Sequence, residues 1–319
     1  MIKWGMIGCG DVTEVKSGPA FNITQKSRLF GVVSRTESSA IDYAKRHNVP
    51  HVFQTISDLI DCSEIDAVYI ATPPSSHAEL ALKVARANKP CCIEKPIANN
   101  YSDALQVTDA FKTSGVPLFV SYYRRSLPRF LTIRSWISDG KIGNVRHIHW
   151  GLMQRPKPED IDQNYAWRKD PNHVPGGYFD DLACHGLDLF DFFLGEITQA
   201  NGISVNQQGI YDVPDSVSAV WQHTGNITGT AFWNFSGYED SDEVVILGDK
   251  GKIIFSIFDD TCPRYETKDD IVSVDIDHPK HVQQYHVEGM VNQLLGRSNY
   301  NSTGENATRT AWVCEQILS

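Results

Sequence analysis

DAVYIATPPSSHAELALKVARANKPCCIEKP, running from Asp66 to Pro96, contains two apolar strand patterns that flank one amphipathic helix pattern. The first strand pattern covers 66–74 and stops at two prolines, the helix pattern covers 77–88, and the second strand pattern covers 89–96. The same alternation fills the first third of the chain, with further strand patterns at 3–10, 28–35 and 116–123 and further helix patterns at 37–48 and 101–115. Strands separated by helices of roughly 10 to 15 residues indicate right-handed βαβ units. We therefore expect an α/β domain with a doubly wound parallel sheet over residues 1–122.

The pattern changes after residue 122, and a chain of 319 residues is long for a single compact core. Short strand patterns bounded by Gly, Asn or Asp follow one another at 145–154, 197–205, 216–224, 227–235, 242–248 and 250–257. Such a succession is typical of a mostly antiparallel sheet. We expect a second, α+β domain with a large open sheet over 123–319. Its aromatic residues Trp221, Phe232, Trp233 and Phe235 belong either to the core or to a dimer face.

Composition argues against several classes of partner. The chain has 29 Lys and Arg against 39 Asp and Glu, a formal net charge of −10, and no basic run that would suit nucleic acid or an anionic membrane. No segment resembles a signal peptide or a membrane span. The seven cysteines lack the paired spacing of a zinc site, so we expect reduced thiols, no metal and a cytoplasmic protein.

The strand pattern at 3–10 leads into a glycine turn at Gly8 and Gly10. Two glycines two residues apart, followed by Asp11 and Val12, let backbone N–H groups approach a pyrophosphate, although Thr13 stands where a third glycine is usual. A purely structural turn is the alternative. A nucleotide turn of this kind would bind a dinucleotide.

The residues at the end of the strand pattern at 28–35 bear on which dinucleotide would bind. A carboxylate at that point selects NAD, whereas this chain has Ser34 and Arg35, whose hydroxyl and guanidinium suit a 2′-phosphate. A solvated surface arginine is the alternative. We expect NADP as the cofactor, with NAD possible.

Ligands bind at the carboxyl ends of parallel strands, where two further segments of this chain fall. Ala71, Thr72, Pro73 and His77 lie where the chain leaves the strand pattern at 66–74, and Glu94 and Lys95 lie at the end of the strand pattern at 89–96. We expect these residues to contact the cofactor, and Lys95 to contact the substrate as well. Helix capping by the serines of the first segment and an exposed lysine in the second are the alternatives.

The stretch GGYFDDLACHGLDLFDFFLGE, 176–196, is an apolar helix pattern that carries four aspartates and a histidine. Asp181 and His185 are four residues apart, so they lie one turn apart on one helix face. A carboxylate one turn from an imidazole can orient it and raise its basicity, which suits a general acid/base. The alternative is a helix whose aspartates face water and whose histidine is part of the core.

Three of these segments, GMIGCGDV, 66–96 and GGYFDDLACHGLDLFDFFLG, together resemble the Gfo/Idh/MocA family of glucose–fructose oxidoreductases and inositol dehydrogenases. The resemblance implies an N-terminal Rossmann domain for a nicotinamide cofactor and a C-terminal domain for substrate. It implies that Lys95 lies near the nicotinamide and stabilises charge on the reacting oxygen. It also implies that His185 exchanges the hydroxyl proton while Asp181 holds the ring or a substrate hydroxyl.

The resemblance further implies a sugar, polyol or related small molecule as substrate, bound in part by Tyr123, Arg124, Trp167 and Arg168. It implies a homodimer or homotetramer formed through the C-terminal sheet. The chain departs from the family pattern at Thr13 and at the segment YYRR that follows the fifth strand pattern. A non-catalytic dinucleotide-binding regulator and a glycosidase that oxidises its substrate transiently remain the alternative functions.

Overall fold

The computed structural model describes residues 1–161 and 174–319 and divides them into two compact units. The first unit comprises 1–127 with 278–308, and the second comprises 128–277 with 309–319. The division differs from the expected boundary at 122/123 chiefly because 278–308 groups with the first unit. The physical reason is helix α10 (Gln284–Leu294), whose Val287, Met290 and Val291 are buried in the core of the first unit.

The first unit contains a six-stranded parallel sheet, which confirms the expected doubly wound architecture. Its strands are β1 (Ile2–Ile7), β2 (Ser27–Val33), β3 (His51–Val52), β4 (Ala67–Ile70), β5 (Cys91–Ile93) and β6 (Leu118–Val120), in the order β3-β2-β1-β4-β5-β6. Every pairing is parallel. The chain reverses its direction of strand addition between β1 and β4, and ligands bind at such a switch point in sheets of this type.

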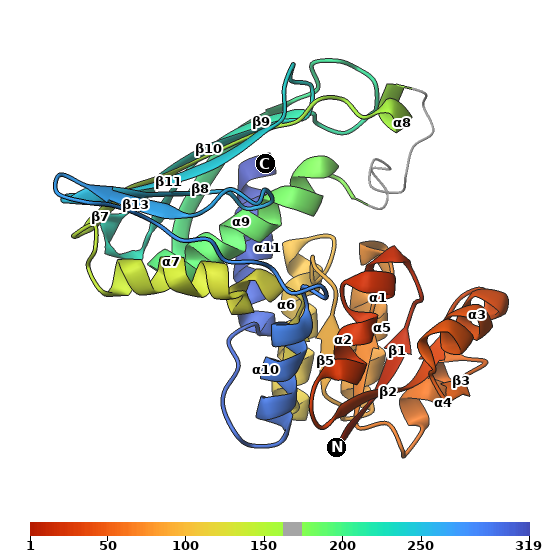
Figure 1. The fold of residues 1–319 in the computed structure, drawn as a ribbon. Helices are drawn as coiled ribbons and strands as arrows, with labels where there is room; N and C mark the ends of the chain where they lie inside the picture. The colour runs from red at the N-terminus through yellow and green to blue at the C-terminus, as the bar shows by residue number, and fades with distance from the viewer. Residues whose placement is uncertain (162–173) are drawn as a thin grey trace. The chain divides into compact units, whose positions relative to one another are not determined.

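Helices connect these strands (Figure 1). They are α1 (Asp11–Val15), α2 (Gly18–Ile23), α3 (Glu37–His47), α4 (Ile56–Asp61), α5 (His77–Arg86) and α6 (Tyr101–Ser114). Helix α5 forms because Leu80, Ala81 and Val84 fall on one face and are buried there. Helix α6 begins where the Asn100 side chain accepts a hydrogen bond from the Asp103 amide at 2.8 Å.

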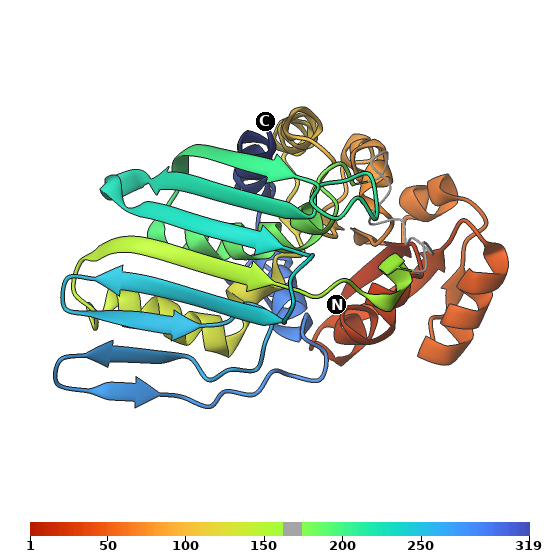
Figure 2. The same ribbon diagram turned by 90° about the horizontal axis from the view of Figure 1, so that it is seen from above.

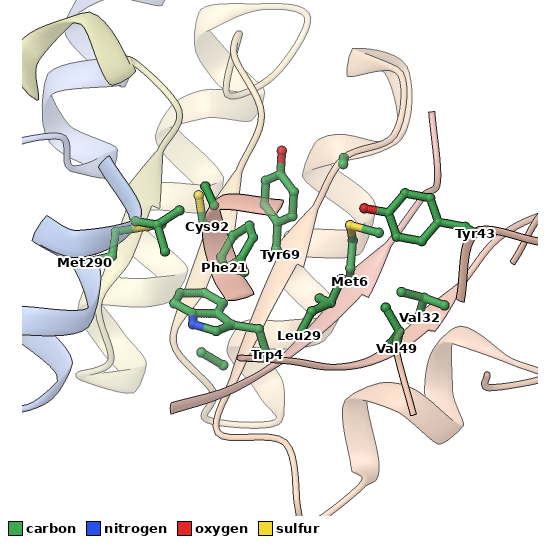
Figure 3. Close-up of a cluster of buried hydrophobic side chains, with 14 of the residues drawn as sticks. Trp4, Met6, Phe21, Leu29, Val32, Tyr43, Val49, Tyr69, Cys92 and Met290 are labelled. Atoms are coloured by element: carbon green, nitrogen blue, oxygen red, sulfur yellow. The ribbon is translucent and has the colours of Figure 1, made fainter. Parts of the chain in front are cut away.

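Figure 3 shows a buried hydrophobic cluster of the first unit, with Met290 of α10 at one end and Tyr43 of α3 at the other. The rings of Trp4 and Phe21 lie 5.0 Å apart between these ends. The cluster therefore joins the start of the sheet to helices from both ends of the sequence, and it fixes the sheet whose carboxyl edge carries the site residues.

The second unit contains an eight-stranded sheet, which Figure 2 shows face-on. Its strands are β7 (Val145–Met153), β8 (Ile197–Val205), β9 (Ser216–His223), β10 (Thr228–Asn234), β11 (Ser241–Gly248), β12 (Gly251–Phe255), β13 (Arg264–Thr267) and β14 (Ile271–Ser273), in the order β14-β13-β12-β11-β7-β10-β9-β8. All pairings are antiparallel except that of β7 with β10. The expectation of a large, mostly antiparallel open sheet is confirmed.

One face of this sheet is covered by helices α7 (Pro128–Ser138), α9 (Tyr178–Leu194) and the second-unit part of α11 (Gly304–Leu318) (Figures 1 and 2). Under α9, Trp150 and Trp221 contact Phe190, and Trp233 contacts Phe179. Trp221, Trp233 and Phe235 are buried, so three of the four aromatic residues left open by the sequence belong to the core. Phe232 is half-buried and alternates with them. The short helix α8 (Pro158–Ile161) precedes the residues outside the description.

Candidate active site

The carboxyl edge of the parallel sheet collects the candidate residues of the first unit. Gly8 follows β1, Ser34 follows β2, Ala71 follows β4, Lys95 comes two residues after the end of β5, and Tyr123 comes three residues after the end of β6. Because the strands are parallel, these positions share one edge of the sheet. The sheet topology thus brings together residues that are up to 115 positions apart in the sequence.

Gly8 occupies a position that only glycine suits. Its φ is +99°, and a Cβ there would lie 2.7 Å from the carbonyl oxygen of Ala71. The Gly8 amide donates to Val33 O at 2.8 Å, and the Ala71 amide donates to Ile7 O at 2.8 Å. Gly8 therefore lets the ends of β1 and β4 meet at the switch point.

Gly10 differs, because nothing lies within 4 Å of the Cβ that it lacks. The residue is exposed, and Asp11 and Val12 begin α1 directly after it. The turn thus presents bare backbone next to open space, which is the geometry that a pyrophosphate needs. The residues of this turn fit a bound dinucleotide.

The place of the missing third glycine is taken by buried Thr13, whose hydroxyl donates to Gly10 O at 2.7 Å. Tyr43 Oη donates to Thr13 O at 2.9 Å, so a tyrosine from α3 fills the space beside the turn. The close approach is instead made by Gly18, where a Cβ would lie 2.0 Å from Tyr43 Oη. Gly18 was not predicted from the sequence, because the need for a glycine there arises from its contact with Tyr43, which is 25 residues away in sequence.

The end of β2 has no carboxylate among its next three residues. Ser34 is half-buried, Arg35 is exposed, and the first acidic residue, Glu37, opens α3. A hydroxyl and a guanidinium therefore stand where NAD-selective sheets place an acid.

His77 is held by the protein at both ring nitrogens. Its ring is fully buried, with Nδ1 2.8 Å from Pro96 O and Nε2 2.8 Å from Thr72 O. Burial lowers the pKa of this imidazole. The ring therefore joins the segment after β4 to the segment that carries Lys95, and both of its nitrogens are already engaged by the protein.

Glu94 is buried as well. Its Oε1 accepts hydrogen bonds from Tyr69 Oη at 2.6 Å and Gln283 Nε2 at 2.8 Å. The backbone N–H of Gln283 in turn donates to Lys16 O, one residue after α1. Glu94 thus ties the end of β5 to Gln283 of the C-terminal segment and, through it, to the end of α1.

Lys95 is half-buried beside these fixed neighbours. Tyr123 and Arg124 open a short 3₁₀ turn after β6, where Arg124 Nη1 donates to Tyr123 Oη at 3.1 Å. Tyr123 is half-buried and Arg124 is buried. An ammonium, a phenol and a guanidinium therefore come from neighbouring strands at the same edge.

The second unit carries Asp181 and His185, both on α9. His185 is buried and its ring lies 5.9 Å from that of Phe258 at an interplanar angle of 80°, while Asp181 is half-buried. Gly186 lets the helix lie directly on the sheet, because a Cβ there would be 2.3 Å from Trp150. The helix thus fixes an imidazole with a carboxylate one turn before it.

The other aspartates of α9 do not simply face water. Asp188 and Asp191 are buried, and Asp191 receives two hydrogen bonds from Arg309, at 2.8 and 2.9 Å. Burial raises the pKa of Asp180 to about 6 although its Oδ2 accepts a hydrogen bond from Gly176 N at 2.7 Å. The reading of a helix with solvated aspartates is therefore wrong for these three.

Two expected substrate residues, Trp167 and Arg168, lie outside the described residues. Within 1–161 and 174–319 no group of His, Cys, Asp or Glu could hold a metal ion, and no helix is long and apolar enough to cross a membrane. All seven cysteines are free thiols.

Comparisons with known proteins identify the family. Residues 2–122 match the oxidoreductase family with an NAD-binding Rossmann fold, and 130–254 match the GFO/IDH/MocA C-terminal domain. Oxidoreductase P35 of Formosa agariphila is 35% identical over 316 residues, which cover 98% of this chain and 97% of that protein. Inositol 2-dehydrogenase of Rhizobium meliloti is 29% identical over 232 residues, covering 69% and 65%.

Among solved structures, levoglucosan dehydrogenase in complex with NADH and levoglucosan superposes with a TM-score of 0.88 at 19% identity, covering 99% of this chain and 96% of that one. This likeness confirms the fold. The two matched domains and the full-length relative show that the chain belongs to the Gfo/Idh/MocA family of NAD(P)-binding oxidoreductases.

Proposed function

We propose that this chain is an NADP-preferring dehydrogenase or reductase acting on a CH–OH carbon of a sugar, polyol or similar hydroxylated compound. The observations that carry the proposal are two sets of residues, one in each unit, whose chemistry suits the two halves of such a reaction. Lys95 sits at the carboxyl edge beside an open glycine turn, and Asp181 and His185 sit one turn apart on a helix seated against the sheet. Relatives named as inositol and levoglucosan dehydrogenases support the substrate class.

The preference for NADP rests on Ser34 and Arg35. An arginine forms charge-assisted, often bidentate hydrogen bonds with a phosphate, and no carboxylate at this strand end would repel it. The solved levoglucosan dehydrogenase contains NADH, so the likeness of fold does not favour NADP. The proposal therefore depends on the chemistry of these two side chains.

Bound nicotinamide would accept or supply the hydride, as it does in other enzymes. The chain's own residues would handle the proton and the charge. His185 takes the hydroxyl proton during oxidation and returns it during reduction, and Asp181 orients the imidazole or a substrate hydroxyl. Lys95 stabilises negative charge that develops on the reacting oxygen. Tyr123 and Arg124, with Trp167 and Arg168, contact the rest of the substrate.

We also propose that two or four chains associate through the face of the eight-stranded sheet opposite α7, α9 and α11. Ile203, Val220 and Leu247 project from that face and are 73%, 55% and 39% exposed. The register places Ile203 and Val220 on adjacent strands, since Ile203 pairs with Ser218, two residues from Val220, whereas Leu247 lies on β11, three strands from β9. Exposed apolar residues gathered on one sheet face are typical of an association surface.

The enzymatic proposal is tested with purified protein, NADP(H) and a panel of polyols and ketoses, following the absorbance of reduced nicotinamide. Lys95→Met and His185→Gln should each lower kcat by on the order of 10²-fold or more. Lys83→Met removes an exposed lysine that pairs with Glu79 and should leave turnover unchanged. Equal turnover by wild type and Lys95→Met would refute the proposed role. Tight binding of NADPH without turnover would favour a regulator, and hydrolysis without net nicotinamide change would favour a glycosidase.

A further inference from the structure

The loop after β12, residues 256–260, places an aromatic ring against the candidate general acid/base. Phe258 lies edge-to-face with His185, the ring centroids being 5.9 Å apart. Both residues belong to the second unit. Phe258 also lies 6.3 Å from Trp150, the residue over which Gly186 of α9 packs. The ring of His185 therefore has an aromatic neighbour that is itself supported by the sheet.

A half-buried carboxylate holds this loop from the sheet side. Asp242 of β11 accepts a hydrogen bond at Oδ2 from the Phe258 amide at 2.6 Å and one at Oδ1 from Trp150 Nε1 at 2.8 Å. One side chain thereby fixes both aromatic residues. Burial raises the pKa of Asp242, so the fold keeps an acid here at an energetic cost.

A buried guanidinium holds the same loop from helix α7. Arg129, in the first turn of α7, is 2% exposed and donates from Nη1 to the Asp259 carbonyl oxygen at 3.0 Å. Ser256 Oγ donates to the same carbonyl at 2.7 Å. Within the described part of the chain, Nε and Nη2 of Arg129 have no acceptor. Arg129 and Asp242 together form what we name the loop clamp.

The loop clamp holds a short surface loop through charged groups whose removal from water costs free energy. Buried charges cost several kcal/mol of desolvation, and apolar side chains of similar size often hold a fold equally well. Costly polar arrangements are typical of places where orientation matters for function. The loop clamp orients Phe258, whose ring lies edge-to-face with the ring of His185.

We propose that Phe258 is a positioning residue for His185, and that Asp242 and Arg129 hold it in place. The inference rests on the proposed function, because it assigns a role in the chemistry of His185. The ring restricts the imidazole to one orientation, and its quadrupole acts on the charged form of the imidazole. Phe258 acts through His185 and takes no part in bond making.

The test compares Phe258→Leu, which loses the ring, with Phe258→Tyr, which keeps it. Phe258→Leu should lower kcat about tenfold and leave the Kd for NADPH unchanged, because only the placement of the imidazole is affected. Phe258→Tyr should retain kcat within about twofold. Asp242→Asn should resemble Phe258→Leu, and Asp240→Asn, an exposed neighbour paired with Arg155, should resemble wild type. A kcat unchanged in Phe258→Leu, or a loss of NADPH binding that parallels the loss of kcat, would overturn the proposal.

A second readout needs no turnover. In protein with isotope-labelled histidine, the NMR signal assigned to His185 by its absence in His185→Gln should titrate with midpoints that differ by about half a pH unit between Phe258→Leu and wild type, because the aromatic quadrupole beside the imidazole is lost. Phe258→Tyr should restore the midpoint. Identical midpoints in all three proteins would sink the positioning role even if His185 proves catalytic. Full turnover by His185→Gln would instead refute the proposed function, while the titration would still decide whether Phe258 acts on the ring.

Discussion

The two glycines of the first turn offer a test that separates folding from cofactor binding. Gly8→Ala puts a methyl group 2.7 Å from Ala71 O at a φ of +99°. The backbone conformation alone costs about 1 to 3 kcal/mol, and the clash with a carbonyl adds to it. We expect the free energy of unfolding to fall by about 2 to 4 kcal/mol, and the melting temperature to fall by about 5 to 15 °C.

Gly10→Ala has no such cost, because its φ is −91° and its Cβ would meet no atom within 4 Å. Its stability without ligand should stay within about 0.5 kcal/mol of wild type. The methyl group would, however, occupy the space that a pyrophosphate needs, so the Kd for NADPH should rise at least tenfold. At a concentration 100 times the wild-type Kd, NADPH stabilises wild type by about 2.7 kcal/mol and would stabilise Gly10→Ala by about 1.4 kcal/mol or less.

Thermal unfolding with and without NADPH measures both effects in one assay. If Gly10→Ala is stabilised by NADPH as much as wild type is, the open turn does not bind the cofactor. If Gly8→Ala unfolds at the wild-type temperature, the strain argued from its φ and its contact with Ala71 does not exist.

Three further predictions concern other parts of the chain. Arg35→Asp should raise the Kd for NADPH about 10- to 100-fold by removing a charge-assisted hydrogen bond and adding a repulsion, and leave the Kd for NADH no higher; equal loss for both, measured by fluorescence titration, would contradict the 2′-phosphate role. Val220→Glu places a charge in the exposed sheet face and should shift the mass measured by light scattering to that of a monomer, whereas an unchanged mass would exclude this face. Burial lowers the pKa of His286 to about 3, so this neutral imidazole stabilises the fold fully above about pH 6.5 and progressively less as pH falls towards 3. His286→Gln, which can still bond Tyr300, should reduce the loss of stability between about pH 6.5 and pH 4 by up to about 3 kcal/mol in urea unfolding; an equal loss in both proteins would show that another group is responsible.

Much of the fold follows from local pattern. The β–α alternation of residues 3–123 predicts the parallel sheet, because strands with apolar runs and amphipathic helices leave a clear periodicity. The two-residue strand β3 leaves no such signal. The placement of α10 in the first unit depends on Val287 and Met290 joining the buried cluster that contains Trp4 and Phe21, which lie near the other end of the chain, and no local pattern contains that information.

The candidate site was predictable where a residue type alone limits the chemistry. Lys95, Asp181 and His185 could be named from type, spacing and resemblance, and Gly8 from its turn. The hydrogen-bond partners of His77 and Glu94 could not be predicted, because they are the carbonyls of Thr72 and Pro96 for His77 and the side chains of Tyr69 and Gln283 for Glu94. Likewise the loop clamp joins α7, β11 and the loop after β12, which are more than 100 residues apart at the extremes, so only the folded chain shows it.

We propose above all that a hydride passes between nicotinamide and a carbinol carbon of the substrate, while Lys95 stabilises the charge on the oxygen and His185 transfers the proton. The most direct measurement supplies NADPH carrying deuterium at C4 to the protein with a panel of ketoses and follows the products by mass spectrometry. We expect deuterium bound to the new carbinol carbon, at a rate that falls at least a hundredfold in Lys95→Met and in His185→Gln. A panel that takes up no deuterium at carbon, or a label that the two variants incorporate as fast as wild type, would contradict it.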